Sequence, residues 1–490
     1  MAAYALRITR ITTSAKLTST ALALVLATSP GMAWADSVIS TGNYTQSVFI
    51  TDNTTVEPGS TFTTTNNDGY GIAALGNGSA YFMPGTSRII TSGFSAYGLL
   101  ARNSATVSGT GRLTISTTGD FAYGVYAADQ SSITLGGATI TTTGGYRQEE
   151  TGAFATYGVA ASSSASIVLA NSSIDVYGPV ARGVLVASGS VFLSGTEITV
   201  HSTDVVYING NAFAAAGIVN YGGGKVSAVD STIKTSGDYS FGVQTSKGGE
   251  TTLIHSSILT SGVGAYGVIA YGPATAILGT VDIQTSGAQA IGIYAYGQDS
   301  QIQIAAHSSI TVSGDSSIGA YASSGSSINL METEIKASGS RSSGATVSGA
   351  DTILGGTSAL IQNSGDGGYG ATARTGGSLN LAKSTIQTTG SSHGLLVTSG
   401  AQAKLRYVQV TTSGTGANGI QITAGGSLDM LGGSASVSGP NAIGAYATGA
   451  GSNLNIHAAS VNADDDAALG GLCRSGCTGN AGVQFCYCFE

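Results

Sequence analysis

Residues 241–262 read FGVQTSKGGETTLIHSSILTSG, and Tyr266-Gly267-Val268 opens a second copy of the same pattern. Each copy begins with a glycine that is followed by an apolar residue, and most copies close on a turn such as Thr260-Ser261-Gly262. The two opening glycines, Gly242 and Gly267, are 25 residues apart. Self-similarity at a fixed period of this length is the sequence signature of a repeat architecture.

The opening glycine, called the marker glycine below, recurs along most of the chain. It marks fifteen copies: Gly71, Gly98, Gly124, Gly158, Gly183, Gly217, Gly242, Gly267, Gly292, Gly319, Gly344, Gly370, Gly394, Gly419 and Gly444. Neighbouring copies are 24 to 27 residues apart, except for two intervals of 34 residues. The first residue after the marker is apolar in all fifteen copies and the third in thirteen, with Asn220 and Thr245 as exceptions. This alternation is the period of a β-strand with one buried face.

Two further apolar groups follow in each copy and predict two more strands. In the copy at Gly158 they are Ile167 and Leu169, then Ile174, with the turn formers Asn171-Ser172 between them. We therefore predict an all-β fold, a right-handed parallel β-helix (solenoid) of about fifteen coils with three short strands per coil. A β-propeller needs ~40 or more residues per blade, and leucine-rich repeats need a leucine frame that this sequence lacks.

The composition supports an ordered, weakly charged rod. Charged residues make up 9% of the chain and hydrophobic residues 42%, whereas disordered chains are rich in charge and poor in apolar residues. The net charge is −8 and the sequence has no basic run. Nucleic-acid binders need clustered Lys and Arg, so we expect no nucleic-acid partner.

The first 35 residues predict a secretory signal peptide. Arg7, Arg10 and Lys16 give a positive start, residues 17–27 are uncharged and mostly apolar, and Ala33-Trp34-Ala35 is a small-x-small cleavage site. We expect cleavage between Ala35 and Asp36. The alternative, an uncleaved membrane anchor, is disfavoured because the apolar run is short for a span.

The rest of the chain divides into three parts by composition. We predict an N-terminal cap over residues 36–70, a β-helix over residues 71–466 and an aberrant cysteine-rich tail over residues 467–490. All four cysteines lie in that tail: Cys473, Cys477, Cys486 and Cys488. Disulfides therefore do not hold the main body together. The tail cysteines could pair or bind zinc, but their spacing matches no trusted zinc frame, and an out-of-frame tail explains them most simply.

Together these features resemble the pertactin-like autotransporter passenger domains of Gram-negative bacteria. The resemblance rests on the signal peptide, the cysteine-free body and the coil Ala-Tyr-Gly-Val…Gly-Ser-x-Ile-x-Leu…Ile-x-Thr-Ser-Gly, over about residues 36–466. It implies type V secretion with the secretion and outer-membrane assembly machinery as partners. It also implies a cell-surface, outer-membrane or extracellular location and a role as an adhesin or virulence-associated protein. The expected ligand is a host cell surface, matrix protein or glycan.

The family resemblance also implies a C-terminal membrane barrel of alternating strands. The printed sequence shows no such pattern after residue 466. We therefore expect a truncated or frame-shifted reading, or a translocator encoded elsewhere. Without a barrel, the expected location becomes the periplasm or the soluble exported fraction.

The two 34-residue copies each carry about nine extra residues and supply the candidate binding loops. The first loop contributes Tyr146, Arg147, Glu149 and Glu150, and the second contributes Asp204, Tyr207, Asn209 and Asn211. Both loops fall between the third strand of one coil and the first strand of the next. Their exit points are two coils apart, so about 10 Å, and we predict one recognition patch. The alternative is tolerated surface insertion, since loops lengthen at little cost.

Two short motifs favour catalysis only weakly. Gly390 to Gly394 fits the Gly-x-Ser-x-Gly nucleophile elbow, but that elbow requires a strand-to-helix turn and no helical pattern follows. Gly314-Asp315-Ser316 is one of four Gly-Asp pairs at the same phase of the repeat, which indicates a turn with Asp accepting backbone amides. We expect no catalytic residue.

The acids and histidines predict neither an enzyme nor a metal protein. Carbohydrate-active β-helix enzymes, such as polysaccharide lyases or depolymerases, are the alternative function, and they need clustered carboxylates on one face. The 26 acidic residues of this chain are scattered, and the five histidines occupy different coils without ligand spacing. We therefore expect no metal and no cofactor.

An aromatic residue precedes the marker glycine in seven copies: Tyr70, Tyr97, Tyr123, Tyr157, Phe241, Tyr266 and Tyr369. Stacked coils would align these rings into a column along the rod. Packing within the column is the favoured interpretation, because stacked rings supply buried area and pair energy. A sugar-binding stripe is the alternative.

Overall fold

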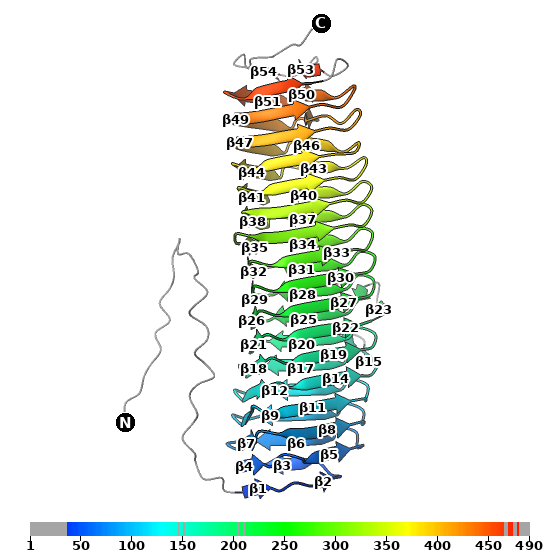
Figure 1. Ribbon diagram of the computed structural model, residues 1–490, viewed down its shortest axis with the longest axis vertical. Coiled ribbons are helices and arrows are strands. Elements are labelled where there is room, and N and C mark those ends of the chain that lie inside the picture. Colours follow the sequence, from blue (N-terminus) through cyan, green and yellow to red (C-terminus); the bar gives the residue numbers. More distant parts are fainter. Residues whose placement is uncertain are drawn as a thin grey trace, which may run out of the picture.

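The protein is described from a computed structural model that covers residues 37–145, 147–149, 152–202, 205–208, 211–464, 469–473 and 478–479. These residues form one straight stack of coils (Figure 1). The stack is a parallel β-solenoid of about 16 turns with a spacing of ~25 residues and three strands per coil. The predicted fold is therefore confirmed. The predicted signal peptide and its cleavage site at Ala35 and Asp36 lie outside the described residues.

Each coil adds one strand to each of three ladders. Ladder 1 holds the marker glycines and consists of β3 (Val48–Ile50), β6 (Tyr70–Leu75), β9 (Tyr97–Arg102), β12 (Tyr123–Ala127), β17 (Tyr157–Ser162), β20 (Arg182–Ala187), β25 (Ala216–Tyr221), β28 (Phe241–Ser246), β31 (Tyr266–Tyr271), β34 (Ile291–Tyr296), β37 (Ile318–Ser323), β40 (Ser343–Ser348), β43 (Tyr369–Arg374), β46 (His393–Val397), β48 (Ile420–Thr423), β50 (Ile443–Thr448) and β53 (Leu469–Cys473).

Ladder 2 follows in each coil after a short turn. It consists of β1 (Ser37–Ile39), β4 (Asn53–Val56), β7 (Ser79–Phe82), β10 (Thr106–Gly109), β13 (Ser132–Gly136), β18 (Ser166–Ala170), β21 (Ser190–Ser194), β26 (Lys225–Val229), β29 (Glu250–Ile254), β32 (Ala274–Gly279), β35 (Ser300–Ile304), β38 (Ser327–Met331), β41 (Ile353–Thr357), β44 (Ser378–Ala382), the first parts of β47 (Gln402–Thr412) and β49 (Ser427–Val437), β51 (Asn453–His457) and β54 (Thr478–Gly479).

Ladder 3 completes each coil. It consists of β2 (Asn43–Tyr44), β5 (Thr61–Thr64), β8 (Thr86–Thr91), β11 (Arg112–Thr117), β14 (Thr139–Thr143), β19 (Ser173–Tyr177), β22 (Glu197–His201), β27 (Thr232–Ser236), β30 (Ser257–Ser261), β33 (Asp282–Thr285), β36 (Ser308–Val312), β39 (Thr333–Ala337), β42 (Leu360–Asn363), β45 (Thr385–Thr388), the second parts of β47 and β49, and β52 (Ser460–Ala463).

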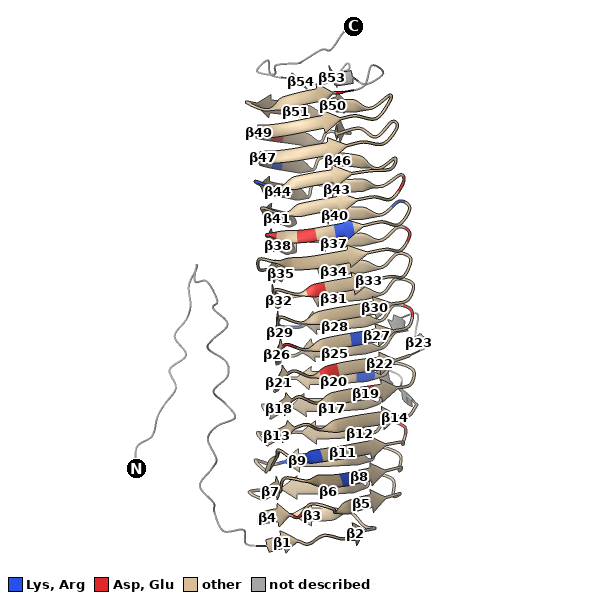
Figure 2. Ribbon diagram, in the orientation of Figure 1, with Lys and Arg blue, Asp and Glu red and all other residues tan. Residues whose placement is uncertain are grey.

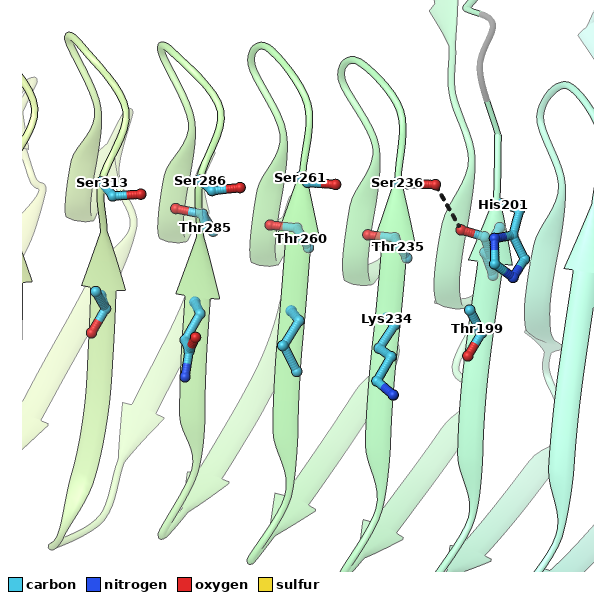
Figure 3. Close-up of a pocket in the computed structure, with 14 residues that line it drawn as sticks. Thr199, His201, Lys234, Thr235, Ser236, Thr260, Ser261, Thr285, Ser286 and Ser313 are labelled. Atoms are coloured by element: carbon cyan, nitrogen blue, oxygen red, sulfur yellow. Dashed lines mark hydrogen bonds between the residues drawn. The ribbon is translucent and has the colours of Figure 1, made fainter.

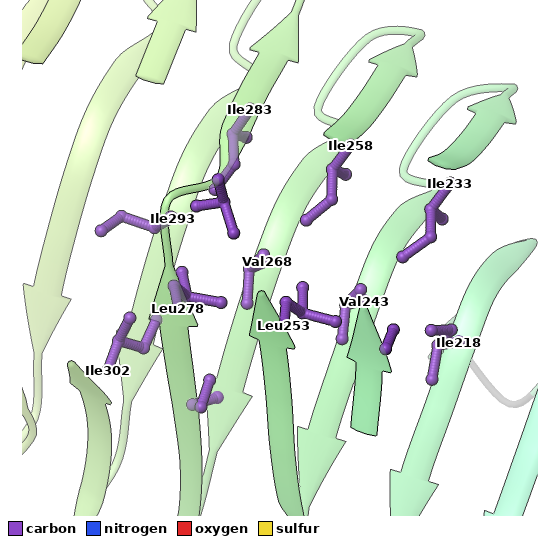
Figure 4. Packing of buried hydrophobic residues seen from close by; sticks show 14 of the residues in the cluster. Ile218, Ile233, Val243, Leu253, Ile258, Val268, Leu278, Ile283, Ile293 and Ile302 are labelled. Atoms are coloured by element: carbon purple, nitrogen blue, oxygen red, sulfur yellow. The ribbon is translucent and has the colours of Figure 1, made fainter. Parts of the chain in front are cut away.

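The core is one continuous column of apolar side chains inside the coils. The residue after the marker glycine is buried in all fifteen copies, which confirms the alternation read from the sequence. Figure 4 shows how one coil contributes Val268 from ladder 1, Leu278 from ladder 2 and Ile283 from ladder 3 to this column. Each coil buries its apolar residues against the coils on either side, as expected for a solenoid.

The marker position requires glycine because two groups approach it closely. A Cβ atom on Gly124 would lie 2.5 Å from Cγ2 of Ile140 and 2.6 Å from the carbonyl oxygen of Gly158 in the next coil. Neither neighbour can move without disturbing the core or the ladder. Close packing, rather than an unusual backbone angle, therefore explains the repeat of glycine along ladder 1.

The two polar exceptions in the core, Asn220 and Thr245, share a hydrogen-bond partner. Asn220 is fully buried, and its Nδ2 donates to the carbonyl oxygen of Glu250 (2.8 Å) and to Oγ1 of Thr251 (3.0 Å). Thr245 donates its hydroxyl to the same Thr251 Oγ1 at 2.7 Å. Buried polar groups are tolerated when they are hydrogen-bonded to each other, so these positions form a small polar network inside an apolar column.

At both ends of the rod, strands outside the predicted β-helix of residues 71–466 also pair into the ladders. Residues 36–70, predicted as a cap, hold β1 to β5, which pair into all three ladders, and the Tyr44 ring stacks on Phe62 at 5.0 Å. Strand pairing also continues past residue 466, where the sequence predicted the end of the β-helix, because β53 pairs with β50. Leu469 is level with Ile443 there, so Gly470 takes a sixteenth marker position. Cys477, Cys486 and Cys488 lie outside the described residues.

Candidate functional site

The two long copies depart from the coil plan by forming β-hairpins. β15 (Arg147–Glu149) pairs antiparallel with β16 (Gly152–Phe154), and β23 (Val206–Ile208) pairs antiparallel with β24 (Asn211–Phe213). The first hairpin follows β14 and the second follows β22, so both leave ladder 3 at the predicted corner. The sequence predicted loops at these places. The second hairpin carries the Asn209-Gly210 pair, a sequence signal for a two-residue hairpin turn.

The two hairpins lie side by side. β16 contacts β23, and Figure 1 places β15 and β23 on the same edge of the rod. Arg147 and Glu149 fall on β15, Tyr207 falls on β23 and Asn211 on β24. Tyr146, Glu150, Asp204 and Asn209 lie outside the described residues. The backbone arrangement thus brings two insertions that are more than fifty residues apart in the sequence next to each other, and together they are called the hairpin pair below.

A small apolar cluster anchors the base of the hairpin pair. Val206, at the start of β23, packs with Ala155, Tyr157 and Val180, all buried. Phe121 closes this cluster, with its ring edge on Tyr157 at a centroid distance of 6.4 Å. Burying a valine side chain contributes roughly 1.5–3 kcal/mol. The cluster is separate from the column inside the coils, and the sequence reasoning did not foresee it.

Six of the seven aromatic residues before the marker glycines stack in two separate runs, whereas Tyr369 packs with a tilted ring on His393. Tyr97 lies on Tyr123 with ring centroids 4.9 Å apart, and Tyr123 lies on Tyr157 at 4.8 Å. Tyr70 extends this run at 5.4 Å, and Phe241 stacks on Tyr266 at 5.4 Å. Burial raises the pKa of Tyr123, and the neighbouring Tyr157 raises it further.

The stacking decides between the two interpretations of the aromatic column. Tyr97 and Tyr123 have both faces covered by rings of the adjacent coils, and each ring at the end of a run has one face on a ring of the column. Sugars pack on ring faces rather than edges, so the geometry favours packing within the column. The sequence missed that residues two after the marker also join, as Tyr294 does on Tyr321 at 4.8 Å.

The serine of the candidate nucleophile elbow is part of a turn. Ser392 is fully buried, donates its hydroxyl to the carbonyl oxygen of Gly365 at 2.5 Å and accepts the amide of Gly368 at 3.0 Å. The chain continues from Ser392 directly into β46 rather than into a helix. Ser392 therefore lacks the exposed hydroxyl and the strand-to-helix context that the elbow requires.

The four Gly-Asp pairs also form turns, as predicted. Each Asp Oδ1 accepts a backbone amide from the next coil: Asp120 from Gly145 (2.5 Å), Asp238 from Val263 (2.8 Å), Asp315 from Ser340 (2.9 Å) and Asp366 from Ser391 (2.9 Å). The amide and hydroxyl of Ser391 lower the pKa of the Asp366 carboxyl. These carboxylates stabilise the corners of the rod and are not arranged for general acid or base chemistry.

The histidines lie apart from one another in different coils. His255 Nδ1 is 3.7 Å from Asp230 and His307 Nδ1 is 3.6 Å from Glu332, and both pairs are exposed. Exposed pairs of this kind contribute little stability. In the described ranges no three His, Cys, Asp or Glu side chains gather as metal ligands. The same ranges contain no helix that is long and apolar enough to cross a membrane.

Charges are sparse and scattered over the rod (Figure 2). The described residues on the face shown there carry isolated charges of both signs. The exposed surface offers mainly hydroxyl and amide groups. The hairpin pair is the feature that departs most from this uniform surface.

The fold and its appended hairpins define a class, the single-stack β-solenoid rods that carry insertions at their corners. The chain is similar in structure to Vag8, an autotransporter passenger domain, in the cryo-EM structure of the Vag8-C1 inhibitor complex. The TM-score is 0.54 at 15% sequence identity, over 89% of this chain and 100% of the other. At this identity the similarity concerns the fold. No protein-family model and no curated protein matches the sequence.

Proposed function

We propose that this chain is the exported β-helical passenger of an autotransporter-like protein, and that its hairpin pair binds a host ligand. The contact between β16 and β23 carries the proposal, because it brings two separate insertions next to each other. The apolar cluster around Val206 and Tyr157 fixes the base of the hairpin pair. A binding loop held by a rigid scaffold loses less conformational entropy when it binds.

The expected partner is a protein or glycan of a host cell surface or matrix, which makes the protein an adhesin or virulence-associated protein. A solenoid of similar fold binds a protein ligand in the Vag8-C1 inhibitor complex. Secretion and outer-membrane assembly machinery would deliver the passenger to the cell surface or the extracellular space. The predicted signal peptide over residues 1–35 supports export.

The protein is proposed to act by binding rather than by catalysis. Two carboxylates that face one side of ladder 3 are already engaged: Glu197 pairs with Lys234 at 2.5 Å, and Asp282 accepts Gln284 Nε2 at 2.7 Å. Glycan-cleaving β-helix enzymes need a free acid and a free base near the scissile bond. These engaged acids do not provide that pair.

Deletion of both hairpins tests the proposal. Removing residues 146–154 and 205–213 takes nine residues from each long copy and restores the 25-residue period. The doubly deleted protein should be exported and should keep the β-rich circular dichroism spectrum of the parent. Its adhesion to cultured host cells and immobilised matrix proteins, measured by flow cytometry and plate binding, should fall to the background of a vector control.

Single deletions sharpen the test. If the two hairpins form one surface, each single deletion should cost most of the binding that the double deletion costs. A double deletion that adheres as well as the parent protein would overturn the binding role of the hairpin pair. A surface-protease assay on intact cells tests the location separately, because only a surface-exposed passenger is cleaved from outside.

A further inference from the structure

A groove runs along the outer face of ladder 3, across β22, β27, β30, β33 and β36, and has a volume of about 390 Å³ (Figure 3). Outward side chains line it in rows. One row consists of Thr199, Lys234, Leu259, Gln284 and Thr311. The other begins at His201 and continues as serines. Parallel register places the members of a row one coil apart, about 4.8 Å. The serine row therefore presents hydroxyl groups at a regular interval, beside a mixed row that includes the apolar Leu259.

The serine row consists of one side chain from each of four successive coils: Ser236, Ser261, Ser286 and Ser313. Figure 3 shows these hydroxyls pointing the same way from the ends of neighbouring strands. A ligand with a similar repeat along its own axis could hydrogen-bond to each coil in turn. A ligand without such a repeat could use only one or two of these groups.

An aromatic platform closes the groove at the β22 end. The His201 ring stacks on the Tyr177 ring with centroids 4.3 Å apart and an interplanar angle of 7°. The next residue in the same row is Ser236, which has no ring. The imidazole face away from Tyr177 is therefore directed along the groove that His201 lines. This differs from Tyr97 and Tyr123 in the tyrosine column, which are each covered by a ring on both faces.

The lysine that lines the groove is paired within the protein. Lys234 Nζ lies 2.5 Å from Glu197 Oε1. Asp282 is a carboxylate that accepts hydrogen bonds from Gln284 and from the hydroxyl of Ser309, and Gln284 lines the groove. A polyanionic chain would need unpaired cations here. A neutral chain rich in hydroxyl groups needs only hydrogen-bonding groups and one open ring face.

We propose that this groove binds an unbranched neutral oligosaccharide that lies along the rod. The apolar face of one sugar ring packs on His201, continuing the stack that Tyr177 begins, and the following sugars hydrogen-bond to the serine row and to Gln284. One sugar unit of an extended chain is about as long as one coil is high. The groove spans five coils, roughly 20 Å, and therefore accommodates about four sugar units. His201 ends β22, directly before the second hairpin, but the serine row lies in the following coils. The two proposals are therefore tested with different ligands.

The test uses purified full-length chain and linear neutral oligosaccharides of two to eight units, covering the common glucan, mannan and xylan linkages. Binding is measured first on a glycan array and then by titration calorimetry. Affinity should rise with length up to about four units and then level off. Heparin and polygalacturonate fragments of equal length should bind at least tenfold more weakly than the best neutral chain.

Four exposed variants locate the site. Tyr177→Ala and His201→Ala each remove part of the platform and should weaken binding by about threefold to tenfold. Ser261→Arg places a long side chain in the middle of the groove and should abolish binding. Tyr271→Ala is the matched control, since Tyr271 and Tyr177 are each 41% exposed and each stacks on one neighbouring ring, yet Tyr271 lies outside the groove. It should bind like the parent protein.

Three results would overturn the proposal: no neutral oligosaccharide in the panel binds, acidic chains bind better than neutral ones, or His201→Ala and Ser261→Arg bind as well as Tyr271→Ala. Thermal unfolding of each variant, expected to match the parent protein, shows that any loss belongs to the groove. The protein without both hairpins should keep oligosaccharide binding. That result separates this site from the hairpin pair.

Discussion

The corner between ladder 3 and ladder 1 takes two forms in this rod. After β30 the chain turns through Ser261 and Gly262 and enters β31 within a few residues. After β14 it extends into a hairpin before entering β17. The register of ladder 1 is nevertheless the same in both places, with Val243 level with Val268 and Val125 level with Val159. The marker glycines and the apolar column set the stacking, and the corners are free to vary.

This separation means that the rod can change its binding surface without changing its core. Loops lengthen at a modest entropic cost, while the spacing of the ladders is fixed by backbone hydrogen bonds. Variation in function is therefore expected at the corners, and variation in stability at the inward positions. Substitutions at inward positions should therefore lower stability more than substitutions at the corners.

The largest loss of stability is expected at a marker glycine, because coils with plain corners and coils with hairpins both depend on this position. Gly124→Ala places a Cβ atom 2.5 Å from Ile140 Cγ2 and 2.6 Å from the Gly158 oxygen, and should lower the free energy of unfolding by about 3 kcal/mol. Gly136→Ala in the same coil is the control, because its nearest neighbour would be 3.7 Å away. That control should change stability by less than about 0.5 kcal/mol. Urea unfolding midpoints measure both, and equal midpoints would contradict the close-packing explanation.

A smaller loss is expected from the polar network in the column. Asn220→Ala removes the donor that serves the Glu250 carbonyl and the Thr251 hydroxyl, and should lower the free energy of unfolding by about 1–3 kcal/mol. Asn329→Ala removes an exposed amide from ladder 2 and should have little effect. If the two variants unfold at the same urea concentration, the network does not contribute to stability.

A change at the hairpin base should affect only the corner. Val206→Ala opens the cluster with Tyr157 and Val180 and should cost about 1 kcal/mol locally, seen as faster limited proteolysis within residues 203–213. Val263→Ala is the matched control, since Val263 lies in a plain corner and is 42% exposed. Mass spectrometry of the fragments identifies the cut. Unchanged cleavage in Val206→Ala would argue against the anchoring role of the cluster.

The smallest effect is a pH dependence from His393. Its neutral Nδ1 accepts the Asn418 amide at 2.9 Å and lies 2.9 Å from Gln421 Nε2, and burial lowers the pKa of this histidine. The unfolded chain therefore takes up the proton first as the pH falls. The stabilisation is present above the unfolded pKa of about 6.5 and is lost as the pH falls through the folded pKa.

The pH dependence has a simple control. Urea midpoints measured between pH 7.5 and pH 5 should fall less steeply in His393→Gln than in the parent protein. His255→Gln removes an exposed histidine that pairs only with Asp230 and should keep the slope of the parent protein. Equal slopes in His393→Gln and His255→Gln would show that His393 is not responsible.

The coil was predictable from sequence because its determinants repeat. Fifteen marker glycines and the apolar residues after them report the same contact many times, so occasional exceptions such as Asn220 do not obscure the pattern. Gly470 was missed because Gly471, not an apolar residue, follows it. The repeated positions therefore made the fold predictable, whereas the last coil was missed because its marker position lacks the repeated pattern.

The candidate sites were predictable only in part. The positions of the two insertions followed from the interval of 34 residues, but the contact between β16 and β23 depends on hairpin geometry that has no repeat. The groove could not be foreseen, because it depends on the stacking of His201 on Tyr177 from a neighbouring coil and on the lack of a ring at Ser236. Which outward side chains align into rows can be worked out only when the register between neighbouring coils is known.

The stacked tyrosines also give the rod an optical signature. The single tryptophan of the sequence is Trp34, within the predicted leader. The leader also holds Tyr4, one of the 22 tyrosines, so the remaining 21 dominate the near-ultraviolet signal of the processed chain. Rings held face to face, as Tyr97, Tyr123 and Tyr157 are, give a circular dichroism signal that vanishes when fixed side-chain packing is lost. The protein therefore carries its own spectroscopic probe of coil stacking, without any added label.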